Sequence, residues 1–295
     1  MERTYYSKII LFGEYSMIFD ATALMIPLVK FSARWQFADN PQDARAKASN
    51  GSLRKFSQYL SDNKLLSQLI DTKSFAKDID KGLYLPSNVP TSYGLGSSGT
   101  LVAAVYDRYA QQRITDLMEL KQVFGLMESH FHGSSSGIDP LQCFLGQPFR
   151  ISPQNGVEPL SNNFLRKSIH IFLIDTKIRS NTKPLVEYFK TQRKDAHYLQ
   201  RFQNEYVPNV RQCIETMVAG QNEAFFHALK QLTIGQTELL RPMITDNTID
   251  LFTADYDFNF GVKISGSGGG GFILGFTDDV EKAQTLLYDR EVLWL

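Results

Sequence analysis

The sequence predicts an α+β fold with two domains. Strand-like and helix-like patterns follow one another along the 295 residues without the regular strand–helix–strand alternation of a parallel α/β sheet. A hydrophobic content of 43% and a charged content of 21% are typical of a globular protein with a substantial core. Turn-forming residues gather at 153–168 and predict a seam, so we assign the two domains to residues 1–165 and 166–295.

The first predicted domain begins with strands and continues with helices. Residues 8–12 predict a short buried strand, and residues 29–37 alternate between apolar and polar side chains, as a half-solvated strand does. Apolar residues at helical spacing predict helices within 53–60, 65–70, 101–109 and 117–131. A hydroxyl-rich loop is expected at 133–137.

The second predicted domain combines a small sheet with many helices. Residues 169–175 are almost continuously apolar, which indicates a central strand. The pattern from 181 to 257 is mostly helical. Two short strands are then expected at 262–265 and 272–276, on either side of the glycine-rich stretch 266–271.

Charge and cysteine content limit the partners. Lys+Arg and Asp+Glu both number 31, so the chain has no overall field to attract nucleic acid or an anionic membrane. Cys143 and Cys213 are too few for a disulfide framework and favour a reducing compartment. The apolar run 9–12 is too short for a signal peptide or a membrane span. We therefore expect a cytoplasmic protein with a small-molecule substrate, and a homodimer remains open.

A glycine- and hydroxyl-rich loop is the strongest functional signal. It reads Gly94-Leu95-Gly96-Ser97-Ser98-Gly99-Thr100 and leads into a helix-like stretch. Glycines let a ligand approach the backbone, and the unpaired amides of a helix N-terminus attract phosphate. The loop alone is ambiguous between a phosphate site and a plain capping turn. A dinucleotide fingerprint is disfavoured, because no clear strand precedes the loop and no suitably placed acid follows it.

Three charged residues and a second glycine run are further candidates. Glu128 shares the apolar stripe of its helix, so it is either a boundary residue that reaches solvent or a metal ligand. Asp139 precedes Pro140 in a predicted polar loop and could be turn chemistry alone. Lys8, the single charge in its strand, could reach solvent or pair with Asp139. The glycines of 266–271 favour close approach of a ligand over a simple turn.

These pieces together resemble the GHMP small-molecule kinases. Residues 8–15 (KIILFGEY), 90–99 (PTSYGLGSSG) and 263–271 (KISGSGGGG) are similar to the first, second and third motifs of that family, in the same order. Glu128 followed by 132–139 (HGSSSGID), and the segment 175–183 (DTKIRSNTK), are most similar to mevalonate kinases within the family. The resemblance implies an N-terminal domain like domain 2 of ribosomal protein S5, a ferredoxin-like C-terminal domain, and an active site between them.

The resemblance also implies roles for individual residues. Asp139 would be the catalytic base, Lys8 its cationic partner, and Ser98 and Glu128 the ligands of Mg²⁺. Residues Gly94 to Thr100 would bind the phosphates of ATP, with the third motif closing on the transferring group. The remaining implied contacts are Gly268, Gly269 and Gly270 for the transferring phosphoryl group or the substrate, and Glu14, Tyr15 and Thr182 for the substrate.

Several positions depart from the family pattern. Tyr15 stands where mevalonate kinases usually have histidine, and Ser135 stands in place of the usual proline. Gly99, Pro140 and Phe272 replace the usual alanine, asparagine and cysteine. The expected activity is ATP-dependent phosphorylation of the primary hydroxyl of mevalonate. The alternatives are a kinase of phosphomevalonate or of a sugar, a nucleotide-binding sensor without activity, and a dinucleotide-dependent oxidoreductase.

Overall fold

The computed structural model describes residues 3–19, 21–40, 43–91, 93–166 and 168–295. The strands are β1 (Tyr5–Phe12), β2 (Ala23–Ala33), β3 (Gln36–Phe37), β4 (Leu83–Tyr84), β5 (Phe149–Ser152), β6 (Gly156–Pro159), β7 (His170–Asp175), β8 (Phe260–Ile264), β9 (Phe272–Thr277) and β10 (Val292–Trp294). The α-helices are α1 (Ala44–Asp62), α2 (Leu66–Leu69), α3 (Thr72–Asp80), α4 (Ser97–Tyr109), α5 (Leu117–His132), α6 (Ile138–Leu145), α7 (Thr182–Gln192), α8 (Ala196–Arg201), α9 (Val207–Ala219), α10 (Asn222–Leu239), α11 (Ile249–Thr253) and α12 (Val280–Leu286). Shorter helical turns are η1 (Ser16–Phe19), η2 (Asn162–Arg166), η3 (Phe202–Tyr206) and η4 (Arg241–Met243).

The chain divides into two compact units. The first unit comprises Met1–Lys8, Pro27–Pro90 and Leu95–Gly146, and the second comprises Ile9–Ile26, Thr91–Gly94 and Gln147–Leu295. This division passes through β1 and β2 and therefore does not test a single boundary near residue 165. The predicted domains 1–165 and 166–295 stay a prediction.

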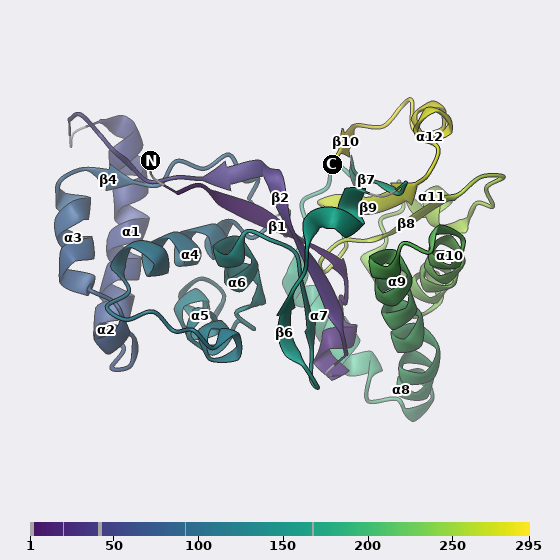
Figure 1. Cartoon of the computed structure of the whole chain (residues 1–295), viewed down its shortest axis with the longest axis horizontal. Coiled ribbons are helices and arrows are strands. Elements are labelled where there is room, and N and C mark those ends of the chain that lie inside the picture. Colours follow the sequence, from purple (N-terminus) through teal and green to yellow (C-terminus); the bar gives the residue numbers. More distant parts are fainter. Residues whose placement is uncertain (1–2, 20, 41–42, 92, 167) are drawn as a thin grey trace. The chain divides into compact units, whose positions relative to one another are not determined.

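Helices α4, α5 and α6 pack on one another in the first unit (Figure 1). The rings of Tyr106, Phe124 and Phe144 meet edge to face between these helices, with centroids 5.1 to 5.5 Å apart. Such aromatic contacts add to the hydrophobic stabilisation of a core. The helical predictions at 53–60, 101–109 and 117–131 are confirmed by α1, α4 and α5.

A four-stranded sheet in the order β10-β7-β9-β8 organises the second unit. All three strand pairs are antiparallel, and β7 lies between β10 and β9, which confirms the central strand predicted at 169–175. Helices α9 and α10 pack side by side, and α10 contacts β8 (Figure 1). A second sheet has the order β1-β2-β5-β6.

One prediction about local structure needs correction. The strand expected at 29–37 is split, because β2 ends at Ala33 and β3 begins at Gln36. Trp35 lies in this break, where its Nε1 donates a 3.1 Å hydrogen bond to the carbonyl of Ala104, so the side chain enters the core. Residues 153–168, predicted as a seam, include the turn between β5 and β6 and the helical turn η2.

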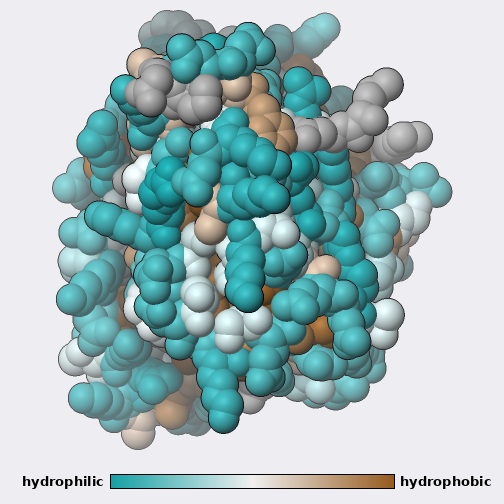
Figure 2. Space-filling view, turned by 90° about the vertical axis from the view of Figure 1, so that its left-hand side faces the viewer, coloured by the Kyte–Doolittle hydropathy of each residue, from teal (hydrophilic) through white to brown (hydrophobic). Residues whose placement is uncertain are grey.

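Hydrophilic side chains dominate the face of the first unit shown in Figure 2, with only scattered hydrophobic residues. Isolated exposed apolar side chains are normal on protein surfaces. Among the residues that the structure describes, none of the helices is long and apolar enough to traverse a lipid bilayer.

Candidate active site

The glycine loop leads directly into α4, as predicted, but the helix begins earlier, at Ser97. Gly96 is the N-cap residue with φ 78°, a left-handed conformation that glycine adopts without strain. A Cβ atom on Gly96 would lie 2.9 Å from Cγ of Lys8, and one on Gly99 would lie 3.1 Å from the carbonyl carbon of Asp139. The two glycines therefore let the start of α4 lie directly against Lys8 and Asp139.

Lys8 and Asp139 form an ion pair, with 2.8 Å between Nζ and Oδ2. The Lys8 side chain is 4% exposed and that of Asp139 is 33% exposed, so the carboxylate faces solvent and the ammonium lies behind it. The amide of Lys8 also donates to the carbonyl of Leu95 at 3.2 Å, which fixes β1 against the glycine loop. Asp139 does not lie in a polar loop, as the sequence suggested, but in the first turn of α6.

Glu128 is buried, with 4% of its surface exposed, which excludes the interpretation of a boundary residue reaching solvent. Its Oε1 accepts a 2.7 Å hydrogen bond from Oγ of Ser98, at the start of α4. Burial raises the pKa of the Glu128 carboxyl, and the negative charge of Asp139 raises it further. The carboxylate form is thus costly without a compensating cation.

The oxygens of Glu128 and Ser98 are suited to a Mg²⁺ site in which phosphate oxygens supply some of the other ligands. Mg²⁺ prefers oxygen ligands and in such sites uses one or two carboxylates, with phosphate oxygens and waters as the other ligands. A site of three or more His, Cys, Asp or Glu side chains does not occur among the described residues.

Other residues of the glycine loop act mainly through the backbone. Leu95 is buried at 2% exposure, and its carbonyl accepts from Lys8. The hydroxyl of Thr100 donates to the carbonyl of Ser97 at 2.8 Å and is buried. Gly94 has φ 71°, again in the left-handed region. The first turn of α4 presents the amides of Ser97, Ser98 and Gly99 at the positive end of the helix dipole.

The third-motif glycines in the second unit have a conformational reason of their own. Gly268, Gly269 and Gly270 all have positive φ, between 67° and 137°. A Cβ on any of them would lie 2.4 to 2.6 Å from atoms of Met243, Leu185 or Ile178. The amides of Gly268 and Gly269 already donate to the carbonyls of Ser265 and Met243. Packing within the chain therefore accounts for glycine at these positions without a ligand. Contact of these glycines with a phosphoryl group stays a prediction.

Glu14 forms a buried ion pair in the second unit. Its Oε1 lies 2.6 Å from Nζ of Lys263, and the two side chains are 2% and 1% exposed. Lys263 also donates to the carbonyl of Ile264 at 2.6 Å, and Gly266 donates its amide to Glu14 at 3.3 Å. Burial raises the pKa of the Glu14 carboxyl despite the neighbouring ammonium. These contacts anchor the beginning of the third motif to the segment after β1.

Tyr15 and Thr182, the other predicted substrate residues, meet at Ser267. The hydroxyl of Tyr15 donates to the Ser267 carbonyl at 2.8 Å, and Oγ1 of Thr182 lies 2.9 Å from Oγ of Ser267. Tyr15 has φ 60°, a strained conformation for a residue other than glycine. The structure therefore brings the two residues together within the second unit, around one residue of the third motif.

Comparisons with known proteins show which proteins this chain is similar to. Residues 63–147 match the family described as the GHMP kinases N terminal domain. The mevalonate kinase of Dictyostelium discoideum is 21% identical, in an alignment that covers 90% of this chain and 85% of that relative. The mevalonate kinase of L. major, solved in complex with R-mevalonate, is similar with a TM-score of 0.66 and 17% identity, over 98% of this chain and 90% of that one. The phosphomevalonate kinase of Streptococcus pneumoniae is similar with a TM-score of 0.64 and 17% identity, over 99% and 98% of the two chains.

The chain has the GHMP kinase fold. The predicted resemblance and the predicted α+β class are both confirmed. Because solved structures of similar TM-score carry the names of mevalonate and phosphomevalonate kinases, the fold alone does not select the acceptor.

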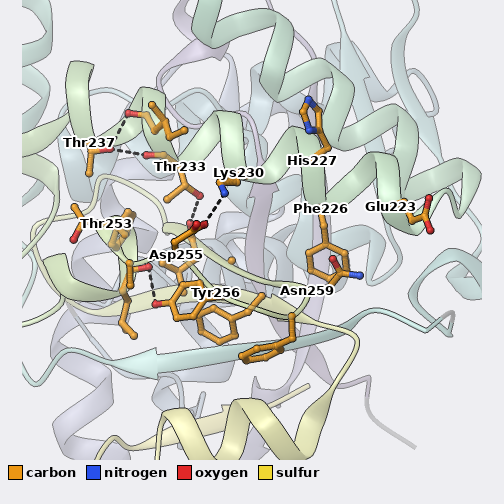
Figure 3. Close-up of a pocket in the computed structure, with 18 residues that line it drawn as sticks. Glu223, Phe226, His227, Lys230, Thr233, Thr237, Thr253, Asp255, Tyr256 and Asn259 are labelled. Carbon is orange, nitrogen blue, oxygen red and sulfur yellow. Dashed lines mark hydrogen bonds and ion pairs between the residues drawn. The ribbon is translucent and has the colours of Figure 1, made fainter.

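A cavity of about 630 Å³ lies elsewhere in the second unit of this GHMP kinase fold (Figure 3). It is lined by α10, α11, the segment 254–259 and β8, and none of the predicted site residues contributes to it. The ion pair between Lys230 and Asp255 joins α10 to the segment 254–259, with 2.6 Å between Nζ and Oδ1. Both side chains are mostly exposed, so this pair contributes little to stability.

Four further residues contact the predicted site residues, although the sequence analysis assigned them no role. Ser135 donates to Glu128, His132 lies 3.0 Å from Oγ of Ser98, Ser267 joins Tyr15 and Thr182, and Lys263 pairs with Glu14. His132 and Ser135 belong to the 132–139 motif, and Lys263 and Ser267 to the third motif, so motif membership was the available signal.

Proposed function

We propose that this protein transfers the γ-phosphoryl group of ATP to the primary hydroxyl of mevalonate, with Mg²⁺ as the metal ion. The observation that carries the proposal is the Lys8–Asp139 ion pair beside the N-termini of α4 and α6. Phosphoryl transfer needs positioned groups and charge neutralisation more than covalent chemistry from the protein. Backbone amides, an ammonium and a carboxylate that is one-third exposed supply those requirements.

Each group has a role that follows from its surroundings. Asp139 is exposed enough to accept a proton from a substrate hydroxyl, and the buried Lys8 would stabilise the negative charge that develops on that oxygen. The amides of the first turn of α4 would bind phosphate oxygens of ATP. Glu128 and Ser98 would hold Mg²⁺, which would neutralise charge on the phosphates. Glu14, Tyr15 and Thr182 are proposed substrate contacts, and Gly268 to Gly270 proposed phosphoryl contacts.

Phosphomevalonate is the second candidate acceptor, and Tyr15 is the observation that favours it. Phosphomevalonate kinases often have tyrosine where mevalonate kinases have histidine. Phosphomevalonate carries an additional phosphate dianion, which would require several Arg or Lys side chains. Lys177 in the segment after β7 is paired with Asp175 and Glu291, so it would have to leave these partners to bind the phosphate of phosphomevalonate.

Measurement of ADP release with mevalonate, phosphomevalonate and several sugars tests the proposal. We expect the highest kcat/KM with mevalonate. A kcat/KM at least tenfold higher with phosphomevalonate would overturn the acceptor but not the kinase activity. Binding of ATP without turnover of any acceptor would favour a sensor, and binding of NAD in preference to ATP would favour the oxidoreductase alternative.

A further inference from the structure

Residue 135 is serine in this chain, whereas proline is usual at this position of the family motif. Its Oγ donates to Oε2 of Glu128 over 2.5 Å. The amide of Gly137 donates to the same Oγ over 3.0 Å. Since a serine hydroxyl has a single proton and the amide occupies one of its lone pairs, the proton of Ser135 is directed at Glu128.

Close packing against α5 fixes Ser135 in this place. A Cβ atom on Gly137 would lie 1.9 Å from the carbonyl oxygen of Lys121, and one on Gly125 would lie 2.9 Å from the carbonyl oxygen of Ser135. The segment that carries Ser135 therefore crosses α5 in backbone contact, within one turn of Glu128. This arrangement leaves little freedom to the hydroxyl.

The two oxygens of Glu128 consequently have different hydroxyl donors. Ser98 donates to Oε1 at 2.7 Å, and Ser135 donates to Oε2 at 2.5 Å. Nε2 of His132 lies 3.0 Å from Oγ of Ser98. Because Ser98 donates its proton to Glu128, a hydrogen bond between Ser98 and His132 would use the imidazole tautomer that carries its proton on Nε2.

We propose that Ser135 is a positioning residue for the divalent cation, which holds Oε2 of Glu128 so that Oε1 alone is presented beside Ser98 as a ligand. This inference rests on the proposed function. Mg²⁺ demands near-ideal octahedral geometry, so a carboxylate whose direction is fixed by a hydroxyl donor would favour its binding. Outer partners of metal ligands typically change metal affinity 10- to 100-fold when they are removed.

Direct binding of Mn²⁺ in the presence of ADP, measured from the EPR signal of free Mn²⁺, tests the proposal. We expect Ser135→Ala and Ser135→Pro, which both lack the hydroxyl, to raise the Kd for Mn²⁺ about tenfold or more. Ser135→Thr keeps the hydroxyl and should bind with the parental affinity. Ser134→Ala removes an exposed hydroxyl from the same segment and serves as the matched control. A merely structural defect would also weaken the binding of ADP measured in EDTA. If Ser135 acts only on the metal ion, the affinity for ADP in EDTA should be the same in all variants.

A Kd for Mn²⁺ within twofold of the parent in either folded, hydroxyl-free variant overturns the role of Ser135. The variant Glu128→Gln separates this failure from failure of the proposed function. If Glu128→Gln weakens Mn²⁺ binding and the Ser135 variants do not, the metal site stands and Ser135 is not part of it. If the parent protein does not bind Mn²⁺ together with ADP, both proposals fail.

Discussion

Replacement of Lys263 by methionine would leave the carboxyl of Glu14 without a cation in the interior of the second unit. Both side chains are almost completely buried, and no described residue donates a hydrogen bond to Oε2 of Glu14. An isolated buried carboxylate is too costly to persist, so in Lys263→Met the Glu14 carboxyl would take up a proton.

The free energy needed to protonate the Glu14 carboxyl determines the expected loss of stability in Lys263→Met. An unfolded glutamate has a pKa of about 4.3, and each pH unit above it costs about 1.36 kcal/mol for the protonated form. Lys263→Met should therefore lower the free energy of unfolding by at most about 4 kcal/mol near pH 7.5 and at most about 1.6 kcal/mol near pH 5.5. Lys263 opposes the rise that burial causes in the pKa of Glu14, so its removal raises the folded pKa further above the unfolded value. A carboxyl with a raised folded pKa loses stability as pH rises from the unfolded pKa through the folded pKa, so the loss is larger near pH 7.5.

Urea unfolding followed by circular dichroism at both pH values measures these losses. The double variant Glu14→Gln/Lys263→Met removes the carboxyl, so it should be more stable than Lys263→Met near pH 7.5 and should lose the added pH dependence. Lys230→Met breaks the exposed ion pair to Asp255 and serves as the control, with little change at either pH. A loss for Lys263→Met that is equal at the two pH values would refute the reasoning.

Three further substitutions test other parts of the structure. Gly137→Ala should be far more destabilising in urea unfolding than Gly133→Ala, because both glycines have φ 74° but, of the two, Gly137 lacks space for a Cβ atom. The positive φ alone costs about 1 to 2 kcal/mol in each variant. Equal losses of stability would contradict the packing around Gly137. Tyr15→Phe should raise the KM for mevalonate and leave the KM for ATP nearly unchanged, and an unchanged KM for mevalonate would remove the hydroxyl from substrate binding. Glu128→Gln should raise the Mg²⁺ concentration for half-maximal rate, with a milder effect in Ser98→Ala, and an unaltered dependence in both would exclude them as ligands.

Local patterns predicted most helices and the central strand correctly, because the apolar periodicity of those segments agrees with their burial. The pattern failed where the chain turns within a periodic stretch. Residues 29–37 alternate like one strand, but Trp35 enters the core in a break between two strands. Asp139 before Pro140 indicated a turn, although proline is well tolerated in the first turn of a helix, where its missing amide proton has no helical partner.

Motif resemblance brought together the residues of the candidate active site more reliably than local chemistry did. The spacing of Lys8 and Asp139 along the chain contains no sign of their contact, which the three-dimensional structure provides. The partnership of Glu14 with Lys263 was missed for the same reason, since 249 positions separate them. The third-motif glycines were explained by ligand approach, because sequence alone does not reveal which backbone atoms of the same chain lie against them.

The turnover of Asp139→Asn with ATP and mevalonate tests the central claim most directly. ADP release would be measured at saturating substrate, with ATP binding measured separately by fluorescence titration. Asp107→Asn is the matched control, because Asp107 is also ion-paired in the first unit, at 2.7 Å from Arg113, but lies far along α4 from the glycine loop. We predict that Asp139→Asn lowers kcat by about 10² or more while ATP still binds, and that Asp107→Asn retains turnover. Near-normal turnover by Asp139→Asn would contradict the account.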